Sequence, residues 1–296
     1  HYNVSLFKFK FIINYKMKPK CCLCFCFYNN EEGLPRALSN MNELNAVFDM
    51  KIIAYYDYST DKSLSIVEKY KENHDNIEII INRNPKHKLR TRNIANARNS
   101  LIQRIRDNYA NYEYFIMMDT NEYSCVGKII LEPIKEMLLR NDEWDSVSFD
   151  RISGYYDTWA LSFDPHIYSF FHFENWRDVV GKMREDFNLL LKTSKNSNKD
   201  LIPVYSAFNG FAIYKIDKFI ECKFSDVINL SLFPENTIKT QVSLVKNNII
   251  NNFIGDCEHR HFHLEAIAKN NAKIRICTAY IFDKVPNPRP GLRGPC

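Results

Sequence analysis

The strongest constraint on the fold is a regular alternation of apolar and amphipathic segments between residues 18 and 125. Four apolar runs each end in polar residues, and they read KCCLCFCFYN, MKIIAYYDYSTD, NIEIIINRN and YEYFIMMDTNEY. Between them, apolar residues recur at helical spacing in the stretches 29–44, 63–71 and 91–109. Alternating strands and helices require right-handed crossovers, which place helices on both faces of a parallel sheet. The sequence therefore predicts an α/β fold with a mostly parallel central sheet.

Polar residues gather directly after three of the predicted strands. They are Tyr28 and Asn29 after the first, Asp57 after the second, and Asp119 with Asn121 after the fourth. The carboxyl ends of parallel strands meet at one edge of the sheet, where the ligands of such folds bind. No G-x-G-x-x-G or Walker motif follows the first strand, which disfavours a dinucleotide-dependent enzyme and a P-loop NTPase. We expect a ligand site at this edge of the sheet.

The pattern changes after residue 125. The predicted elements are a helix at 131–140, a strand and aromatic loop at 144–163, a polar exposed stretch at 192–200, an apolar strand at 203–215, and a turn, helix and closing strand at 256–282. We divide the chain into an N-terminal extension (1–16), the first half of a single domain (17–125), its second half (126–283) and a Pro/Gly-rich tail (284–296).

The charge pattern argues against a nucleic-acid partner. The 40 lysines and arginines are spread along the chain without a long run, and the formal net charge is +5. A dedicated nucleic-acid binder carries a denser basic patch, whereas a mild excess still favours a small anion such as a nucleoside diphosphate. No run reaches the ~20 apolar residues that span a bilayer, and no signal-peptide cleavage site is present. We therefore expect a soluble, cytoplasmic protein without a transmembrane segment.

Four of the nine cysteines lie in the first apolar run, at Cys21, Cys22, Cys24 and Cys26. On a strand, the last three face one side and Cys21 faces the other. Their spacing does not match the C-x₂₋₄-C pairs of zinc sites. We interpret them as small apolar residues of a buried core strand, which weakly favours a reducing compartment.

The segment Met117–Asn121 is the strongest element for chemistry. An acidic residue, a spacer and a second acidic residue at a strand end place two oxygens on one side of a turn, where they bind a hard divalent cation. Here Asp119 supplies the carboxylate and Asn121 supplies a neutral amide oxygen in the second position. The alternative is that Asp119 serves only as a turn or helix-capping residue.

A second candidate site is the segment DCEHRHFH at 256–263, because it holds three of the eight histidines. In one interpretation, His259 or His263, which share a helix face, completes a metal site with Asp119. In another, Glu258 or Asp256 is the general base that deprotonates an acceptor hydroxyl. The alternative is structural, with Asp256 as a helix cap and the histidines as packing residues.

Seven short segments, taken in order, resemble one enzyme family. They are FYNNEE, YYDYSTD, RTRNIANARN, MMDTN, YYDTWAL, AFNGFAIYK and DCEHRHFH, and they extend over residues 20–283. Together they resemble GT-A glycosyltransferases, in particular capsule-associated mannosyltransferase-like enzymes and their viral and bacterial relatives. The resemblance implies a GT-A-like, Rossmann-like fold and transfer of a sugar from a nucleotide-sugar co-substrate to a glycan or other hydroxyl acceptor. It also implies Mn²⁺ or Mg²⁺ on the donor diphosphate, and Asn121 departs from the second aspartate of many members.

The resemblance assigns donor roles to residues of the first half. Tyr28 and Asn29 would border the nucleotide, and Asp57 would contact its base or ribose. Arg92 or Arg98 would meet the diphosphate, because the planar guanidinium suits phosphate oxygens.

Residues of the second half are implied to form the acceptor side. Trp159 would stack on a sugar ring and Asp157 would bind its hydroxyls. Asn209 belongs to the same side, and Gly210 would let the backbone approach the donor sugar closely. Core packing is the alternative for the aromatic residues. The competing functions are a sugar-1-phosphate nucleotidyltransferase and an inactive GT-A-like carbohydrate-binding protein.

Overall fold

The computed structural model describes most of the chain. The described residues are 17–121, 124–152, 154–168, 172–197, 199–227, 229–233, 235–245 and 255–285. The predicted N-terminal extension, 1–16, lies outside them, as does the predicted tail from residue 286 onward. Within the described part of the chain, no helix is long and apolar enough to cross a membrane.

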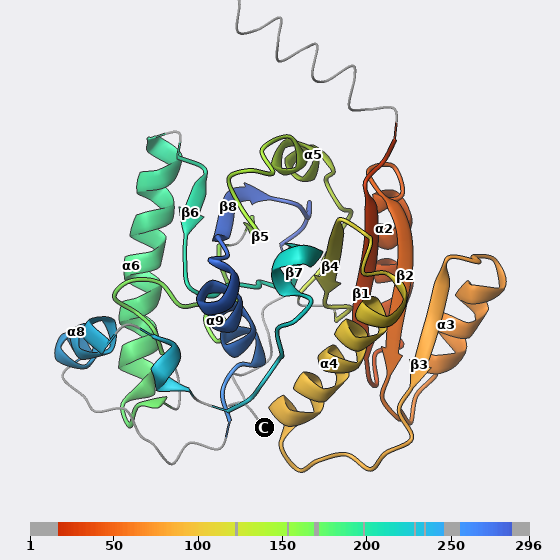
Figure 1. The fold of residues 1–296 in the computed structure, drawn as a ribbon, viewed down its shortest axis with the longest axis horizontal. Helices are drawn as coiled ribbons and strands as arrows, with labels where there is room; N and C mark the ends of the chain where they lie inside the picture. Colours follow the sequence, from red (N-terminus) through yellow and green to blue (C-terminus); the bar gives the residue numbers. More distant parts are fainter. Residues whose placement is uncertain are drawn as a thin grey trace, which may run out of the picture.

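Strands and helices alternate through the first half, as predicted (Figure 1). In chain order the elements are β1 (Lys20–Phe27), α2 (Leu34–Leu44), β2 (Asp49–Tyr56), α3 (Ser63–Glu72), β3 (Ile77–Ile81), α4 (Arg90–Asn108), β4 (Tyr114–Met118), α5 (Glu132–Leu139), β5 (Ser146–Asp150), α6 (Trp176–Asn196), β6 (Leu201–Pro203), β7 (Phe211–Lys215), α7 (Ile216–Phe219), the 3₁₀ helix η2 (Leu230–Leu232), α8 (Glu235–Val245), α9 (Glu258–Asn270) and β8 (Ile274–Tyr280).

Within the described residues, one sheet of eight strands runs in the order β3-β2-β1-β4-β7-β5-β8-β6. The strands β1 to β4 pair in parallel, which confirms the predicted α/β fold. Strand β7 is antiparallel to both of its neighbours, and β6 is antiparallel to β8. The sheet is therefore parallel in the first half of the chain and mixed in the second.

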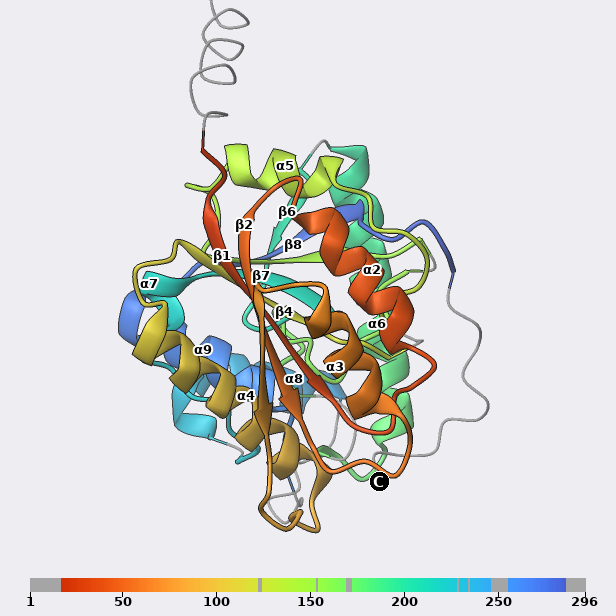
Figure 2. The same ribbon diagram turned by 90° about the vertical axis from the view of Figure 1, so that its right-hand side faces the viewer.

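Two hydrophobic cores cover the two faces of the sheet. Helices α2, α3 and α5 pack on one face, and α4, α7 and α9 pack on the other (Figure 2). Helix α6 packs against β6 and β8 at the end of the sheet (Figure 1). Because both faces are covered, the carboxyl ends of the parallel strands remain as the exposed edge where a ligand site can form.

Strand β1 shows how the sequence determines this arrangement. Cys22 and Cys24 lie in the core on the α4 side, with Cys26 packed against that core, whereas Cys21 lies in the core on the α2 side. Burial in both cores confirms the interpretation of the cysteines as apolar residues of a central strand.

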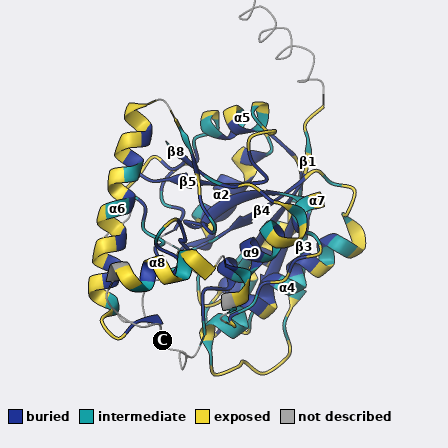
Figure 3. Cartoon of the chain, turned by 60° about the vertical axis from the view of Figure 1, so that its left-hand side comes forward, coloured by how far each residue is buried: buried dark blue, intermediate teal, exposed yellow. Residues whose placement is uncertain are grey.

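Helix α6 (Trp176–Asn196) was not predicted, although its apolar residues recur at helical spacing. Met183, Phe187 and Leu191 face the core, and the opposite face of the helix is exposed (Figure 3). The stretch predicted to be polar and exposed, 192–200, is mostly exposed but belongs in part to the last turns of this helix.

Candidate functional site

The carboxyl ends of β1 and β2 are tied together by Asn29. Its backbone adopts the left-handed conformation, with φ of 42°. Its side-chain oxygen accepts a hydrogen bond from the backbone amide of Thr60 at 2.8 Å. The backbone amide of Asn29 donates to Ser59 Oγ at 3.0 Å. Asn29 therefore shapes the loop after β2, and the exposed ring of Tyr28 stands beside it.

Lys86, from the loop after β3, completes this corner. Its ammonium lies over the Tyr28 ring, 3.7 Å from Asp57 Oδ2, and donates to the Tyr58 carbonyl at 2.9 Å. Asp57 Oδ1 also accepts from Asn82 Nδ2 at 3.1 Å. The structure thus brings the predicted donor residues Tyr28 and Asp57 together. Sequence reasoning did not identify Lys86 as a site residue. The basic run KHKLR, which begins at Lys86, could have indicated it.

Asp119 follows β4 directly, as predicted, and its side chain is 28% exposed. Its backbone amide donates to the Gly210 carbonyl at 2.8 Å, which attaches it to β7. Its Oδ2 accepts from Ser124 Oγ at 3.2 Å, and its Oδ1 accepts from Arg98 Nη2 at 3.2 Å. Asn121 Oδ1 accepts from the Ser124 amide at 2.8 Å, so the side chains of Asp119 and Asn121 both contact Ser124 in the same turn.

Arg98 lies at the centre of the site. Its side chain is buried, and its guanidinium contacts Asp119, Glu258 Oε1 and His259 Nε2. The Phe208 ring packs against the guanidinium at 4.8 Å from its centroid. Burial acts to lower the pKa of Arg98, but the neighbouring Glu258 and Asp119 outweigh it and raise the pKa. The cation is therefore permanent and fixed in position.

Arg92 and Arg98, the two arginines predicted to meet a diphosphate, have different partners in the structure. Arg92 pairs with Asp226 and has no described contact with Asp119. Arg98 reaches both Asp119 and the first turn of α9. Of the two arginines, Arg98 is the one that lies at the carboxyl end of β4.

His259 binds the arginine rather than pointing at Asp119. Its ring stacks on Phe208 at 3.9 Å, and burial together with the Arg98 charge lowers its pKa well below the usual value. Since Nε2 accepts from the guanidinium, the neutral ring carries its proton on the buried Nδ1. No lone pair of this tautomer remains for a metal ion.

His263 lies deeper in the core. Its Nδ1 is hydrogen-bonded to Ser206 Oγ at 2.9 Å and its Nε2 to Tyr214 Oη at 3.2 Å. Burial and the charges of Arg98 and Arg260 lower its pKa to about 3. The structure places this predicted metal ligand in a packing role. Among the described residues, no group of three or more His, Cys, Asp or Glu side chains is arranged to hold a metal ion.

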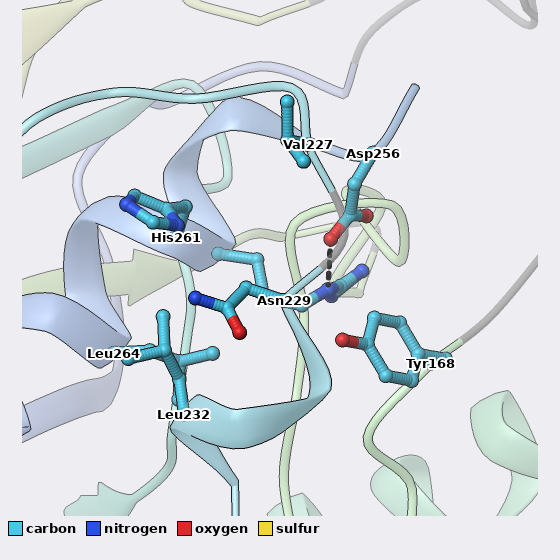
Figure 4. Close-up of a pocket in the computed structure, with 8 residues that line it drawn as sticks. Tyr168, Val227, Asn229, Leu232, Asp256, His261 and Leu264 are labelled. Carbon is cyan, nitrogen blue, oxygen red and sulfur yellow. Dashed lines mark hydrogen bonds and ion pairs between the residues drawn. The ribbon is translucent and has the colours of Figure 1, made fainter. Parts of the chain in front are cut away.

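Asp256, one of the two predicted bases, is also structural. It is buried, pairs with Arg260 Nε at 3.1 Å and binds His172 Nε2 at 3.0 Å. Burial would raise its pKa, but Arg260 and His172 outweigh it and lower the pKa, which makes a poor base. The ion pair is drawn as a dashed line in Figure 4, beside a small pocket lined by Tyr168, Val227, Asn229, Leu232, His261 and Leu264. Cys257, not Asp256, is the N-cap of α9.

The four predicted acceptor residues lie in different surroundings: Trp159 packs against the core, whereas Asn209, Gly210 and Asp157 lie close to the strand ends. Trp159 is packed against the core, stacks on His172 at 5.7 Å, and its carbonyl accepts from Arg260. These contacts of a partly buried ring agree with core packing, the alternative for this aromatic residue. Asn209 and Gly210 both have positive φ, 56° and 85°, and they connect the ends of β4 and β5.

Asp157 is hydrogen-bonded to Asn209. The side-chain oxygen of Asn209 accepts from its amide at 3.3 Å, and its own Oδ1 accepts from the Ala160 amide at 3.3 Å. Burial, followed by repulsion from Asp119, raises the pKa of Asp157 to about 6. Ser124 Oγ contacts both Asp119 and Tyr156 Oη, so this segment adjoins the strand end. Sequence reasoning missed Ser124 and Tyr156.

Comparison with known proteins gives a match over the first four strands. Residues 22–120 match the family model described as Glycosyl transferase family 2. No curated protein matches the sequence.

Several solved structures are similar to the chain. S. aureus TarS has 16% identity and a TM-score of 0.49, over 89% of this chain and 36% of TarS. The mannosyltransferase PcManGT from Pyrobaculum calidifontis, in complex with GDP-Man and Mn²⁺, has 14% identity and a TM-score of 0.49, over 93% of this chain and 59% of that protein. Glucosyl-3-phosphoglycerate synthase from Mycobacterium tuberculosis has 10% identity and a TM-score of 0.40, over 70% and 59%. The chain thus spans less than two thirds of the length of each of these proteins.

Proposed function

We propose that this chain is a glycosyltransferase, more specifically a hexosyltransferase, that moves a sugar from a nucleotide-sugar donor to a glycan or other hydroxyl acceptor. The family match over residues 22–120 supports glycosyl transfer in general. The ordered motifs that resemble capsule-associated mannosyltransferase-like enzymes support the finer assignment. In this proposal, residues 17–125 bind the donor and residues 126–283 bind the acceptor.

The observation that carries the proposal is the convergence of Arg98 and Asp119 at the carboxyl end of β4. Arg98 Nη2 lies 3.2 Å from Asp119 Oδ1, and the guanidinium is held from behind by Glu258. Departure of a nucleoside diphosphate requires that its developing negative charge be neutralised. A fixed positive charge at this strand end stabilises such a charge electrostatically, and its buried surroundings strengthen that interaction.

The donor set of this edge fits a divalent metal ion. Mg²⁺ and Mn²⁺ prefer oxygen ligands, and they are commonly held by one or two protein oxygens together with substrate phosphates and water. Asp119 and Asn121 are the two residues that would hold the ion, because their oxygens face one turn and Asp119 is partly exposed. When bound, the metal would act as a Lewis acid on the diphosphate.

The remaining donor residues orient the nucleotide. Tyr28 offers an exposed ring at the end of β1, and Asp57 offers a carboxylate beside it for a base or ribose hydroxyl. Lys86 lies between these two side chains and adds a positive charge at the same corner. These groups bind and position the donor, which lowers the entropic part of the barrier.

A thermal-shift and hydrolysis screen tests the function. UDP-glucose, UDP-N-acetylglucosamine and GDP-mannose are each added with Mn²⁺ or with EDTA. We expect one donor to raise Tm when Mn²⁺ is present and to be slowly hydrolysed to the nucleoside diphosphate. Asp119→Ala should lose both effects, whereas Asp75→Ala, at an exposed aspartate before β3, should keep them.

Other products or ligands would contradict the proposal. Pyrophosphate release from a nucleoside triphosphate and a sugar 1-phosphate would favour a nucleotidyltransferase. Glycan binding without any response to nucleotide sugars would favour an inactive carbohydrate-binding protein.

A further inference from the structure

Two carboxylates close to Asp119 and Arg98, those of Glu258 and Asp157, have different surroundings. Glu258 is buried and contacts the guanidinium of Arg98 directly. This contact between two buried side chains holds the guanidinium in place and occupies the carboxylate of Glu258. The charge of Glu258 is therefore committed to positioning Arg98.

Asp157 is only partly buried and has no such partner. Its Oδ1 accepts a hydrogen bond from the Ala160 amide at 3.3 Å. Among the residues that the structure describes, no cation forms an ion pair with Asp157 and no donor contacts its Oδ2. One oxygen thus fixes the carboxyl group, and the other is available to accept a proton.

Two separate connections place Asp157 beside Asp119. The backbone amide of Asp119 donates to the Gly210 carbonyl, and the backbone amide of Asp157 donates to the side chain of the adjacent Asn209. Ser124 Oγ forms the second connection, because it contacts Asp119 Oδ2 at 3.2 Å and Tyr156 Oη at 2.8 Å. In the first connection, Asn209 and Gly210 hold positive φ angles, and Asn209 Nδ2 also donates to the Phe149 carbonyl.

We propose that Asp157, rather than Glu258, is the catalytic base that deprotonates the acceptor hydroxyl, and that Glu258 is a positioning residue for Arg98. This inference rests on the proposed glycosyl transfer. The raised pKa of Asp157, which follows from burial and from repulsion by Asp119 and Glu258, suits the role, because a base works best when its pKa approaches the working pH.

The step is balanced in atoms and electrons. The acceptor oxygen forms a bond to the anomeric carbon while its proton passes to Asp157 Oδ2. The bond between the anomeric carbon and the diphosphate oxygen breaks, and its electron pair leaves with the nucleoside diphosphate. Arg98 stabilises that leaving charge, so base and cation act on opposite ends of the same displacement.

Asp157→Asn tests the assignment, because asparagine keeps an oxygen for the Ala160 amide and removes the basicity. We use the nucleotide sugar that the wild-type protein hydrolyses in the screen, with water and then sodium azide as acceptors. Water must lose a proton to react, whereas azide is already an anion. In Asp157→Asn, hydrolysis should fall about 100-fold or more, while azide should give glycosyl azide as fast as in the wild-type protein. The Kd values for donor and for Mn²⁺ should not change.

Three results would overturn the assignment of Asp157. Hydrolysis at the wild-type rate would show that no proton passes to it, and loss of the azide reaction would show a structural defect. Weaker Mn²⁺ binding would make it a metal ligand instead.

Glu258→Gln provides the comparison. As a positioning residue, it should raise the donor KM and slow the azide and water reactions alike. A loss restricted to water would return the role of base to Glu258. If no nucleotide sugar binds the wild-type protein at all, the proposed function itself fails, and that result is distinct from every outcome above because it does not involve the variants.

Discussion

Nη2 of Arg98 lies 3.2 Å from Oδ1 of Asp119, and this contact joins the third turn of α4 to the carboxyl end of β4. The same guanidinium contacts Glu258 at the start of α9. One buried cation thus connects the parallel half of the sheet to the closing helix, and its charge is directed at the strand end where polar ligands of such sheets bind.

Replacing Arg98 by methionine should strongly destabilise the protein. Removing one member of a buried ion pair leaves the other charge uncompensated, and the free energy of unfolding should fall by about 3–5 kcal/mol. Urea unfolding measures this loss, and the double variant Arg98→Met/Glu258→Gln should recover part of it. The partly exposed pair Arg104–Glu78 is the control, because Arg104→Met should cost about 1 kcal/mol or less. Equal losses at both sites would mean that the Arg98 contacts contribute no more than a surface pair.

Gly210 and Gly154 form a matched test of the close approach at the site. Their φ angles are +85° for Gly210 and +88° for Gly154, so alanine is strained at either position. A Cβ on Gly210 would lie 2.7 Å from Ser124 Cβ, whereas a Cβ on Gly154 would meet nothing within 4 Å. Gly154→Ala should cost about 1–2 kcal/mol from the backbone alone. Gly210→Ala should cost clearly more and also displace Ser124, and equal urea midpoints for the two variants would contradict this.

Much of the strand-end site could be predicted from the sequence because strand ends are local features. The apolar runs ended where the strands end, and Asp119 follows β4 directly. The distinction between Arg92 and Arg98 could not be made in this way. Arg98 is buried because α9 packs on α4 and brings Glu258, 160 residues away along the chain, to its guanidinium. Helical spacing describes one helix and contains no information about such a partner.

The histidines show the same limit. Three histidines in eight residues suggested a metal site, and the shared face of His259 and His263 was predicted correctly, with the rings 5.7 Å apart. Their partners decide their role, however. Ser206 and Tyr214 come from the region of β7 and occupy both nitrogens of His263.

The buried His263 should make stability depend on pH below neutrality. Its pKa in the folded protein is about 3, far below the usual value near 6.5. The unfolded chain therefore binds the proton first as pH falls, so this contribution to stability is complete above pH 6.5 and is lost progressively toward pH 3. His263→Gln should flatten the decrease in Tm between pH 7 and pH 4. His87→Gln, at an exposed position, should leave the slope unchanged. A steep slope that survives in His263→Gln would assign the effect to other groups.

Asp157 should affect stability in the opposite sense. Its pKa is about 6 in the folded protein and near 3.8 in an unperturbed aspartate, so the folded state resists ionisation. Ionised Asp157 therefore lowers the free energy of unfolding, and this destabilisation is complete above pH 6. It disappears as pH falls from 6 toward 4. The charged groups that face it are Asp119 and Glu258, which raise the pKa, and Arg98, which lowers it.

Asp157→Asn carries no charge at any pH, so its Tm in EDTA should exceed that of the wild-type protein at pH 8. The difference should shrink by pH 4, where the wild-type carboxyl is protonated in the folded state. Asp61→Asn is a control of opposite sign. Although burial raises the pKa of Asp61, hydrogen bonds from Ser63 and Glu31 outweigh it and lower the pKa, so this variant should lose stability at pH 8. A lower Tm for Asp157→Asn at pH 8 would mean that the ionised carboxylate stabilises the fold, which is the behaviour of a structural residue and not of a base held ready to accept a proton.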